Sequence, residues 1–354
     1  MPYRQTAKIY QLAEWLEPGL AAPFISVVIT TRNRPATFEA ALNSVVAQRY
    51  STHEIVVVQD GSDEVHIPAY EQLFATLRQR IGGRLRCVNL PASAQGSGSG
   101  AVMNAGVQAA SGRYVAFLDD DDLWIDPEHL QRAVDVLRAD AASGRQADLY
   151  FANQEAMQEQ QLIAPRWLAP LQGLLTREGQ SPGAMGAYRV TVDDLLRTPG
   201  FCHVNCLTVR RELYLQVGGR DESIRWEGDH NLYLRLIDKA HFMVHHPAVV
   251  ARHHVPVPAL QASVTTSLAL TERRIWQARS MELAAAAVQS PAVRKRALRV
   301  QSNALKHAAT EAAANGEWRA ARTHAYRALR LRPSAKWLAF TAWCLAMSLW
   351  LSQS

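Results

Sequence analysis

Apolar runs alternate with amphipathic stretches along the first two thirds of the chain. The runs are nearly continuous, which is typical of strands that are buried on both faces of a parallel sheet. They predict strands at residues 24–30, 54–59, 85–90, 114–118, 148–152, 206–209 and 241–251. The amphipathic stretches predict helices at residues 36–48, 70–80, 101–110, 128–142, 211–217 and 225–237. This order of elements predicts an α/β domain with a mostly parallel sheet and helices on both faces.

Three other segments depart from this pattern. Residues 1–22 are amphipathic, and we expect them to form a leader helix that packs on the outside of the domain. Residues 153–200 are rich in Gly, Pro and Gln, and we expect an irregular region that shapes the site of a second substrate. From residue 258 onward, Ala, Leu, Arg and Gln recur at helical spacing. We therefore expect an α/β domain over residues 23–257 and a helical C-terminal region over residues 258–354.

The C-terminal region carries one repeat-like unit and an apolar end. Residues 315–318 separate two predicted helices, and the spacing of Ala321, Ala325 and Ala328 is typical of a tetratricopeptide unit. A lone unit cannot bury its own face, so we expect it to pack on the rest of the protein or on a partner. Residues 337–351 are very apolar and follow a basic helix. This combination suits peripheral binding to an anionic membrane, and it equally suits burial on the protein body or in a dimer.

Four consecutive carboxylates, Asp119, Asp120, Asp121 and Asp122, directly follow the predicted strand at residues 114–118. Ligands of open α/β sheets bind at the carboxyl ends of the strands, which is where these side chains are expected to lie. Adjacent carboxylates raise one another's pKa unless a cation lies among them. Divalent cations such as Mg²⁺ and Mn²⁺ take oxygen ligands and are often shared with substrate phosphates. The alternative is a solvated acidic turn that leads into the next helix.

Composition narrows the class of protein. The formal net charge is +6, and the basic excess is concentrated from Arg273 onward, which suits phosphate-rich partners or an anionic membrane. No nucleic-acid-binding module is visible, so we expect no nucleic acid partner. Four scattered cysteines are too few for a disulfide framework, and the spacing of Cys202 and Cys206 is only a weak indication of zinc. We find no apolar signal-peptide core and no apolar run long enough to span a bilayer, and we expect a cytoplasmic protein, with a peripheral place at the inner face of the membrane as one option.

Five segments, taken in order, resemble family 2 glycosyltransferases, which have the Rossmann-like GT-A fold. These segments are residues 26–35, 54–62, 104–106, 117–124 and 226–229. The resemblance covers about residues 23–255 and implies a nucleotide-sugar-binding half at 23–127 and an acceptor half at 128–257. It implies transfer of a sugar from a nucleotide-diphosphate-sugar, which we expect to be UDP-linked, to a hydroxyl of a glycan or lipid-linked acceptor in surface glycan or glycolipid synthesis.

The resemblance also assigns roles to the donor side of the site. Asp60 would accept hydrogen bonds from the base, although an Asp before Gly is also a common turn former. Thr30, Arg32 and Asn33 would line the nucleotide pocket, and Asn104 belongs to the matching Asn-x-Gly motif. The resemblance places the metal motif at Asp119 and Asp121, with Asp120 near the ribose or the metal; His254, or less favourably His253, would approach the metal or the diphosphate. A bound Mn²⁺ or Mg²⁺ would stabilise the charge of the leaving diphosphate.

One general base is implied, and it is matched by Asp229. This carboxylate would take the proton of the acceptor hydroxyl in a single displacement with inversion. Glu227 is the alternative, because the family usually has Glu immediately before this Asp, whereas here Gly228 intervenes. A plain acidic residue at a helix N-terminus is the structural explanation for Asp229.

Two positions depart from the family pattern. Gln59 stands where the family usually has an acid, and Met103 stands where it often has a basic residue. These departures leave open a non-catalytic scaffold or binding protein with a degenerate transferase domain. A sugar-1-phosphate nucleotidyltransferase is a further alternative, but residues 30–34 lack the Gly-rich loop with Arg and Lys that it requires.

Overall fold

The computed structural model describes residues 11–15, 24–81, 84–93, 96–142, 144–163, 167–256 and 268–350. By contacts within the chain, it divides into two compact units. The first comprises Met1–Glu222 and Lys239–Val255, and the second comprises Ser223–Asp238 and Pro256–Ser354. The first contains the sheet and the second is helical, so residues 223–238, which we placed in the acceptor half, group with the C-terminal helices. The boundaries of independently folding domains stay a prediction.

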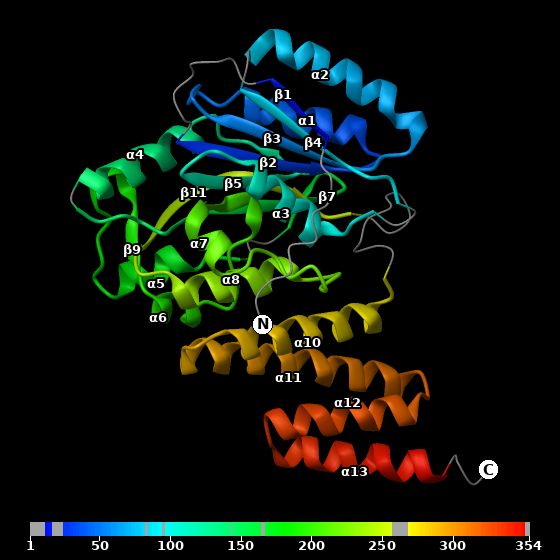
Figure 1. Ribbon diagram of the computed structural model, residues 1–354. Coiled ribbons are helices and arrows are strands. Elements are labelled where there is room, and N and C mark those ends of the chain that lie inside the picture. Colours follow the sequence, from blue (N-terminus) through cyan, green and yellow to red (C-terminus); the bar gives the residue numbers. More distant parts are fainter. Residues whose placement is uncertain are drawn as a thin grey trace. The chain divides into compact units, whose positions relative to one another are not determined.

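The first unit is built around one sheet (Figure 1). Its strands are β1 (Gln11–Trp15), β2 (Ile25–Thr31), β3 (Glu54–Asp60), β4 (Leu85–Leu90), β5 (Tyr114–Asp119), β6 (Leu123–Trp124), β7 (Leu149–Gln158), β8 (Gln161–Ile163), β9 (Tyr188–Val190), β10 (Leu207–Arg210) and β11 (Met243–His254). Its helices are α1 (Pro35–Val46), α2 (Ile67–Ile81), α3 (Ser99–Ala109), α4 (His129–Ala142), α5 (Leu171–Arg177), α6 (Val192–Arg197) and α7 (Arg211–Gln216). The predicted α/β architecture is confirmed.

The strand order is β1-β4-β3-β2-β5-β10-β7-β11-β6. The four central strands β4, β3, β2 and β5 are parallel, as are β7 and β11, whereas β10 runs antiparallel between β5 and β7. Crossover connections between parallel strands are right-handed, so the direction of each crossover decides which face its helix covers. Helices α1 and α2 therefore cover one face and α3 covers the other (Figure 1).

The core lies where the apolar runs predict it. Tyr114 to Leu118 of β5 are at most 2% exposed, and the apolar side chains of β2 and β3 are equally buried. Their continuous hydrophobicity follows from burial on both faces of the sheet, which the covering helices provide.

The predicted leader helix at residues 1–22 is wrong where the structure describes it. Gln11–Trp15 forms strand β1, which pairs antiparallel with β4 at the edge of the sheet. The backbone of β4 would otherwise present unpaired N–H and C=O groups, and β1 satisfies them. A stretch of five residues cannot distinguish the two patterns by periodicity alone. The rest of this predicted helix lies outside the described residues.

The prediction of an irregular region at residues 153–200 is also wrong. Strand β7 continues to Gln158, and the segment adds β8, α5, β9 and α6. Helix α6 begins with a capping box in which Thr191 and Asp194 satisfy each other's backbone N–H groups. In β7, polar Asn153 is nevertheless buried, and its side-chain amide donates to the Pro247 carbonyl at 3.0 Å. A strand that buries polar side chains in this way does not show the continuous apolar run that predicts a buried strand.

The second unit contains α8 (Gly228–Lys239), α10 (Leu270–Ala287), α11 (Pro291–Ala314), α12 (Trp318–Leu331) and α13 (Ala335–Trp350). The last four stack in chain order (Figure 1). The predicted break at residues 315–318 is confirmed, because α11 ends and α12 begins there. Ala321, Ala325 and Ala328 are fully buried in α12, and small side chains let neighbouring helices approach closely. The repeat-like pair α11–α12 buries its faces on α10 and α13. No helix among the described residues is both long and apolar enough to cross a membrane.

A buried histidine at the start of α4 gives a prediction for acid stability. His129 is 1% exposed, its ring meets Trp124 edge-on at 4.7 Å between centroids, and its Nδ1 has no hydrogen-bond partner. Burial lowers its pKa to about 3. Between pH values of about 3 and about 6.5, the unfolded chain therefore binds a proton at His129 that the folded chain does not bind. The free energy of unfolding falls as the pH falls through this window.

Linkage gives a loss of about 2 kcal/mol in the free energy of unfolding between about pH 7.5 and about pH 5 from this side chain alone. Urea unfolding at both pH values should show that loss in the wild type and a smaller one in His129→Gln, which cannot titrate. An equal loss in both proteins would contradict this assignment.

Candidate functional site

The carboxyl ends of three parallel strands meet at one edge of the sheet. Thr30 near the end of β2 is paired with Asp119 at the end of β5, and Thr31 is paired with Gln59 of β3. Asp60 ends β3 one residue further on. The predicted polar residues of the three strand ends are thus brought together by the register of the sheet.

The acidic segment forms a tight turn between β5 and β6. The backbone N–H of Asp122 donates to the Asp119 carbonyl at 3.2 Å. Asn205 holds both ends of this turn, since its side-chain oxygen accepts from the Asp119 N–H at 3.0 Å and its amide donates to the Asp122 carboxylate at 2.5 Å. Asn205 is itself 1% exposed, so it is a rigid support for the turn.

Asp122 is fully buried and surrounded by donors. Besides Asn205, the His253 ring contacts its carboxylate at 2.8 Å and the His254 N–H donates to it at 2.7 Å. Burial disfavours the charged form, but the hydrogen bond and charge of His253 and the charge of His203 outweigh burial and lower the pKa of Asp122. His253 is stabilised in return, because the Asp122 carboxylate raises its pKa to about 9 against the opposing effect of burial. Asp122 is therefore a fixed negative charge beneath the turn.

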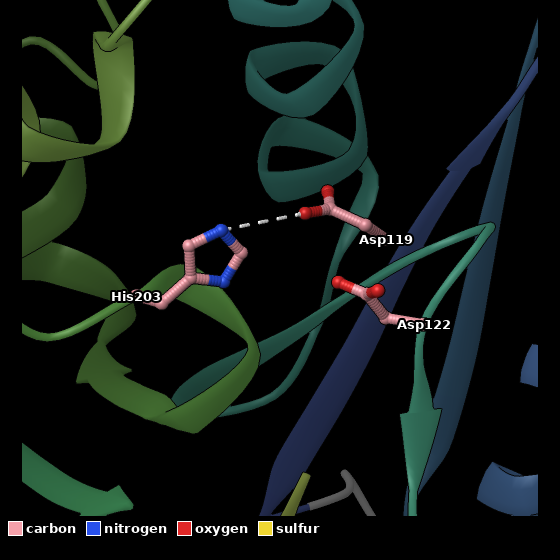
Figure 2. A group of neighbouring side chains, drawn as sticks. All are labelled: Asp119, Asp122 and His203. Carbon is pink, nitrogen blue, oxygen red and sulfur yellow. Dashed lines mark ion pairs between the residues drawn. The ribbon is translucent and has the colours of Figure 1, made fainter. Parts of the chain in front are cut away.

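Asp119, Asp122 and His203 form a candidate metal centre (Figure 2). One ligand atom from each lies within 4.8 Å of the others, and the distance from His203 Nε2 to an Asp119 oxygen is 3.9 Å. Burial and the charges of Asp122 and Asp121 raise the pKa of Asp119 to about 8. Two carboxylates and one imidazole suit Mn²⁺, and the carboxylates suit Mg²⁺. Carboxylates held together against their mutual repulsion favour the binding of a cation.

The predicted ligands Asp121 and His254 have different contacts. Arg34 approaches the Asp121 carboxylate at 2.6 Å and the Asp120 carboxylate at 3.4 Å. His254 donates from Nδ1 to the Asp121 carbonyl at 2.7 Å. Burial raises the pKa of Asp120 to about 6, although the Arg34 charge acts in the opposite direction. Both predicted ligands border the centre, but the group with mutually close ligand atoms contains Asp122 and His203 instead.

The base-binding candidates lie at the end of β3. The buried Asp60 carboxylate accepts from the Ser97 N–H at 2.9 Å. Gly96 stands over it with a φ of +73°, and a Cβ at Gly96 would come within 2.5 Å of the Asp60 carboxylate and 3.0 Å of the Arg32 guanidinium. Arg32 itself donates to the Ser93 carbonyl at 2.7 Å. The structure therefore brings Asp60, Arg32 and the Gly/Ser loop together.

Asn33 connects two loops of this edge. Its side-chain amide donates to the Asp63 carboxylate at 2.8 Å, and its oxygen accepts from the Asp63 N–H at 2.7 Å. It has a positive φ of 56°, a conformation that Asn tolerates better than most residues. Its observed contacts hold the loop after β2 against the loop after β3.

Asn104 is buried on α3 and fixes a distant loop. Its side-chain oxygen accepts from the Tyr214 hydroxyl at 2.8 Å and from the Arg220 N–H at 2.9 Å, and its amide donates to the Arg220 carbonyl at 2.9 Å. The Arg220 guanidinium lies 3.8 Å from the sulfur of Met103, and its positive charge acts to lower the pKa of Asp119. The family often has a basic residue at the position of Met103. In this chain Arg220, from another part of the sequence, places a guanidinium next to Met103.

The two candidate bases belong to the second unit. Glu227 has a φ of +59°, and its carboxylate accepts from the Gln277 amide at 2.6 Å and lies 3.4 Å from His230 Nδ1. The Ser280 hydroxyl donates to the Glu227 carbonyl at 2.8 Å. Asp229 is half-buried in the first turn of α8. Glu227 is therefore held by α8 and α10 within this unit.

Cys202 and Cys206 are buried free thiols, and neither belongs to the acidic group. Sequence patterns did not reveal Arg34, His203, Asn205 and Arg220 as site residues. Arg34 lies inside the motif at residues 26–35, and His203 and Asn205 lie between the two cysteines that were considered for zinc. Histidine, asparagine and arginine are common in binding sites, so their residue types are a weak signal. Only the folded sheet brings His203, Asn205 and Arg220 near Asp119, because they lie far from it along the chain.

A mostly parallel sheet with acidic side chains at the carboxyl edge of its strands is typical of GT-A-like glycosyltransferases. The model of the Glycosyl transferase family 2 matches residues 26–214, more than half of the chain, and the chain belongs to this family.

Relatives and a solved structure agree with this family. An uncharacterized glycosyltransferase of Nostoc sp. is 32% identical over 171 residues, which is 47% of this chain and 50% of that protein. The Escherichia coli protein named UDP-Glc:alpha-D-GlcNAc-diphosphoundecaprenol beta-1,3-glucosyltransferase WfgD is 24% identical over 52% of this chain and 58% of its own. The matches thus span 50% and 58% of the length of these two curated relatives. The crystal structure of S. aureus TarS 1–349 in complex with UDP-GlcNAc has a TM-score of 0.60 at 15% identity and covers 87% of this chain and 81% of its own, which shows the shared fold.

Proposed function

We propose that the protein is an inverting, metal-dependent glycosyltransferase that moves a sugar from a nucleotide-diphosphate-sugar to a hydroxyl of a glycan or lipid-linked acceptor. The observation that carries the proposal is the group Asp119, Asp122 and His203 at the strand edge that also holds Asp60, in a chain of family 2. The donor we expect is UDP-linked, and the name of the E. coli relative supports both this donor and a lipid-linked acceptor for surface glycan synthesis.

On the donor side, we propose a set of ligands for a cation and a set of residues that bind the base. Asp119, Asp122 and His203 would hold Mn²⁺ or Mg²⁺, with Asp121 and His254 at its border and Asp120 near the ribose. A bound cation would neutralise charge on the leaving diphosphate as the glycosidic bond breaks. Asp60 would accept hydrogen bonds from the base, and Thr30, Arg32 and Asn33 would line the pocket. Asn104 would act by fixing the loop that carries Arg220.

On the acceptor side, we propose Asp229 as the base that takes the hydroxyl proton. We propose a positioning role for Glu227, because its carboxylate is held by the Gln277 amide at 2.6 Å and lies 3.4 Å from His230 Nδ1. The oxygen freed of its proton attacks the anomeric carbon as the diphosphate leaves from the opposite side. One base without an enzyme nucleophile supports inversion.

Arg220 gives a prediction on the diphosphate. Arg220 is 9% exposed and its Nε has no hydrogen-bond partner, so this N–H can donate to a phosphate oxygen. We expect Arg220→Ala to weaken UDP binding about ten- to a hundred-fold, the effect of losing a hydrogen bond to a charged group. Calorimetry with uridine is the matched control, because uridine lacks the phosphates and its binding should not change. Equal losses for UDP and uridine would contradict a phosphate contact.

Slow hydrolysis of the donor in the absence of acceptor tests the function itself. Purified protein is mixed with UDP-, GDP- or TDP-linked sugars, with and without Mn²⁺, and proton NMR follows the anomeric signal of the released sugar. We expect metal-dependent release from one donor class with inverted configuration. A released sugar of retained configuration would contradict inversion. Nucleotide binding with no turnover of any donor would favour the non-catalytic scaffold.

A further inference from the structure

The exposed side chains of α13 that follow Lys336 are apolar. Residues 337–350 contain no Asp, Glu, Lys or Arg. Leu338, Leu345 and Leu349 are 61%, 43% and 53% exposed, and their spacing of seven and four residues places them on one stripe of the helix. Trp350, at 65% exposed, and Trp343, at 48%, lie on a second stripe further round the helix, and the Trp343 ring also meets Trp318 of α12 edge-on at 4.8 Å between centroids. We call these five side chains the α13 face. Large apolar side chains gathered this way on an exposed helix mark an interaction surface.

The opposite side of α13 already has its partner. Cys344 is fully buried with Ala312, Ala313 and Ala321 of α11 and α12. Ser348 is 6% exposed, and the Arg322 guanidinium donates to its hydroxyl at 3.3 Å. The helix is therefore docked on the stack through one side, and the five side chains of the α13 face are 43% to 65% exposed.

Positive charge gathers at the beginning of α13. Lys306 lies over the Trp337 ring at 5.2 Å, and burial together with the charges of Arg332 and Lys336 lowers the pKa of Lys306. No acidic side chain among the described residues forms an ion pair with these three. Residues 315–354 contain six Lys or Arg and a single acid, Glu317. The repulsion within this basic cluster would be relieved by anionic groups.

We propose that the α13 face and the basic cluster of Lys306, Arg332 and Lys336 together bind an anionic lipid membrane. The helix would lie in the plane of the interface, with leucines among the acyl chains, tryptophans at the headgroup level and the basic cluster on the phosphates. Its 16 residues make a helix about 24 Å long, shorter than the roughly 30 Å of a bilayer core, so an in-plane position fits better than a crossing. A second copy of the chain could cover the leucines, but it would leave the basic cluster uncompensated. The proposal does not depend on the transfer reaction.

Cosedimentation of the full-length protein with vesicles tests the proposal. We expect binding to phosphatidylglycerol–phosphatidylcholine vesicles, little binding to phosphatidylcholine alone, and release by salt, because headgroup attraction is screened. Leu345→Asp combined with Leu349→Asp should lower the bound fraction at least about ten-fold, since charges replace inserted leucines. Lys336→Glu should weaken binding about five-fold or more, the effect of one basic residue at an anionic surface.

Matched variants separate the surface from general charge effects. Val65→Asp changes an apolar side chain that is 79% exposed on the first unit, and Lys295→Glu makes the same charge change near the other end of α11. Both should bind vesicles like the wild type. Circular dichroism and unfolding temperature confirm that each variant is folded. If the folded wild-type protein does not bind anionic vesicles, the proposal is wrong. If the α13 variants instead convert a dimer to a monomer in light scattering, the face is a self-association surface and the membrane proposal is wrong.

Discussion

Asp119→Asn should abolish most of the transfer activity while leaving the protein at least as stable as the wild type. The variant keeps the shape of the side chain but removes the carboxyl group that would ionise when a cation binds at the candidate metal centre. Removing one preorganised group that stabilises developing charge typically costs about 10²–10³-fold in rate, and we expect a loss of about 10³-fold because cation binding is lost as well. Donor turnover at saturating Mn²⁺ is the measurement.

The stability of the variant follows from the pKa of the same carboxyl. Burial and the neighbouring carboxylates raise the pKa of Asp119 to about 8, whereas in the unfolded chain it lies near 3.9. The folded chain therefore holds a proton that the unfolded chain loses, so ionisation of Asp119 opposes folding as the pH rises through this window. Asn cannot ionise and avoids that opposition. We expect an unchanged or higher unfolding temperature near neutral pH.

Asp193→Asn is the matched control, since it makes the same change at an exposed position of α6 without a described ion pair. It should leave activity unchanged. Full activity in Asp119→Asn would rule this carboxylate out as a metal ligand. A sharp loss of stability would show instead that Asp119 is an ionised structural residue.

Asp229→Asn should lower transfer about 10³-fold without weakening UDP binding. General base catalysis typically contributes about 10²–10⁴-fold, and an amide cannot take the acceptor proton. Transfer to a glycan acceptor and calorimetric binding of UDP are measured on the same preparation. The base acts on the acceptor and not on the nucleotide, so only the first quantity should change.

Glu227→Gln separates the two candidate bases. It removes the charge of Glu227 but leaves an oxygen that can still accept from Gln277, so we expect a modest effect on transfer. If Glu227→Gln loses about as much activity as we expect of Asp229→Asn, while Asp229→Asn retains activity, Glu227 is the base and the proposed assignment must be exchanged. If Glu227→Gln and Asp229→Asn both lower transfer only slightly, neither carboxylate is the base that takes the acceptor proton.

The sheet could be predicted from the sequence because its central strands are buried on both faces. Continuous apolar runs such as Tyr114–Leu118 are too short for buried helices and alternate with helical stretches, so they indicate buried strands of a parallel sheet. The edge strand Gln11–Trp15 could not be predicted from the sequence, because its conformation depends on pairing with β4. Five residues are too few for periodicity to distinguish a strand from a helix. The same holds for β7, where polar Asn153 is buried and its side-chain amide donates to the carbonyl of Pro247 in β11.

The site divides in a similar way. Asp60 and Asp119 could be located because both directly follow apolar strands, and the carboxyl ends of parallel strands share one edge. His203 and Asn205 could not, because they lie more than 80 residues along the chain and meet the acidic turn only after β10 inserts beside β5. The resemblance to the family implies Asp121 as a ligand, and in the folded turn its carboxylate lies 2.6 Å from the Arg34 guanidinium.

Calorimetric titration with UDP, GDP and TDP, each with and without Mn²⁺, tests the central claim most directly. The wild type and Asp119→Asn are compared, with Asp193→Asn as the control. The account predicts that one nucleotide binds the wild type and the control tightly, that binding requires Mn²⁺, and that Asp119→Asn loses the metal-dependent part. A folded wild type that binds none of the three nucleotides would contradict a nucleotide-sugar site at this edge of the sheet.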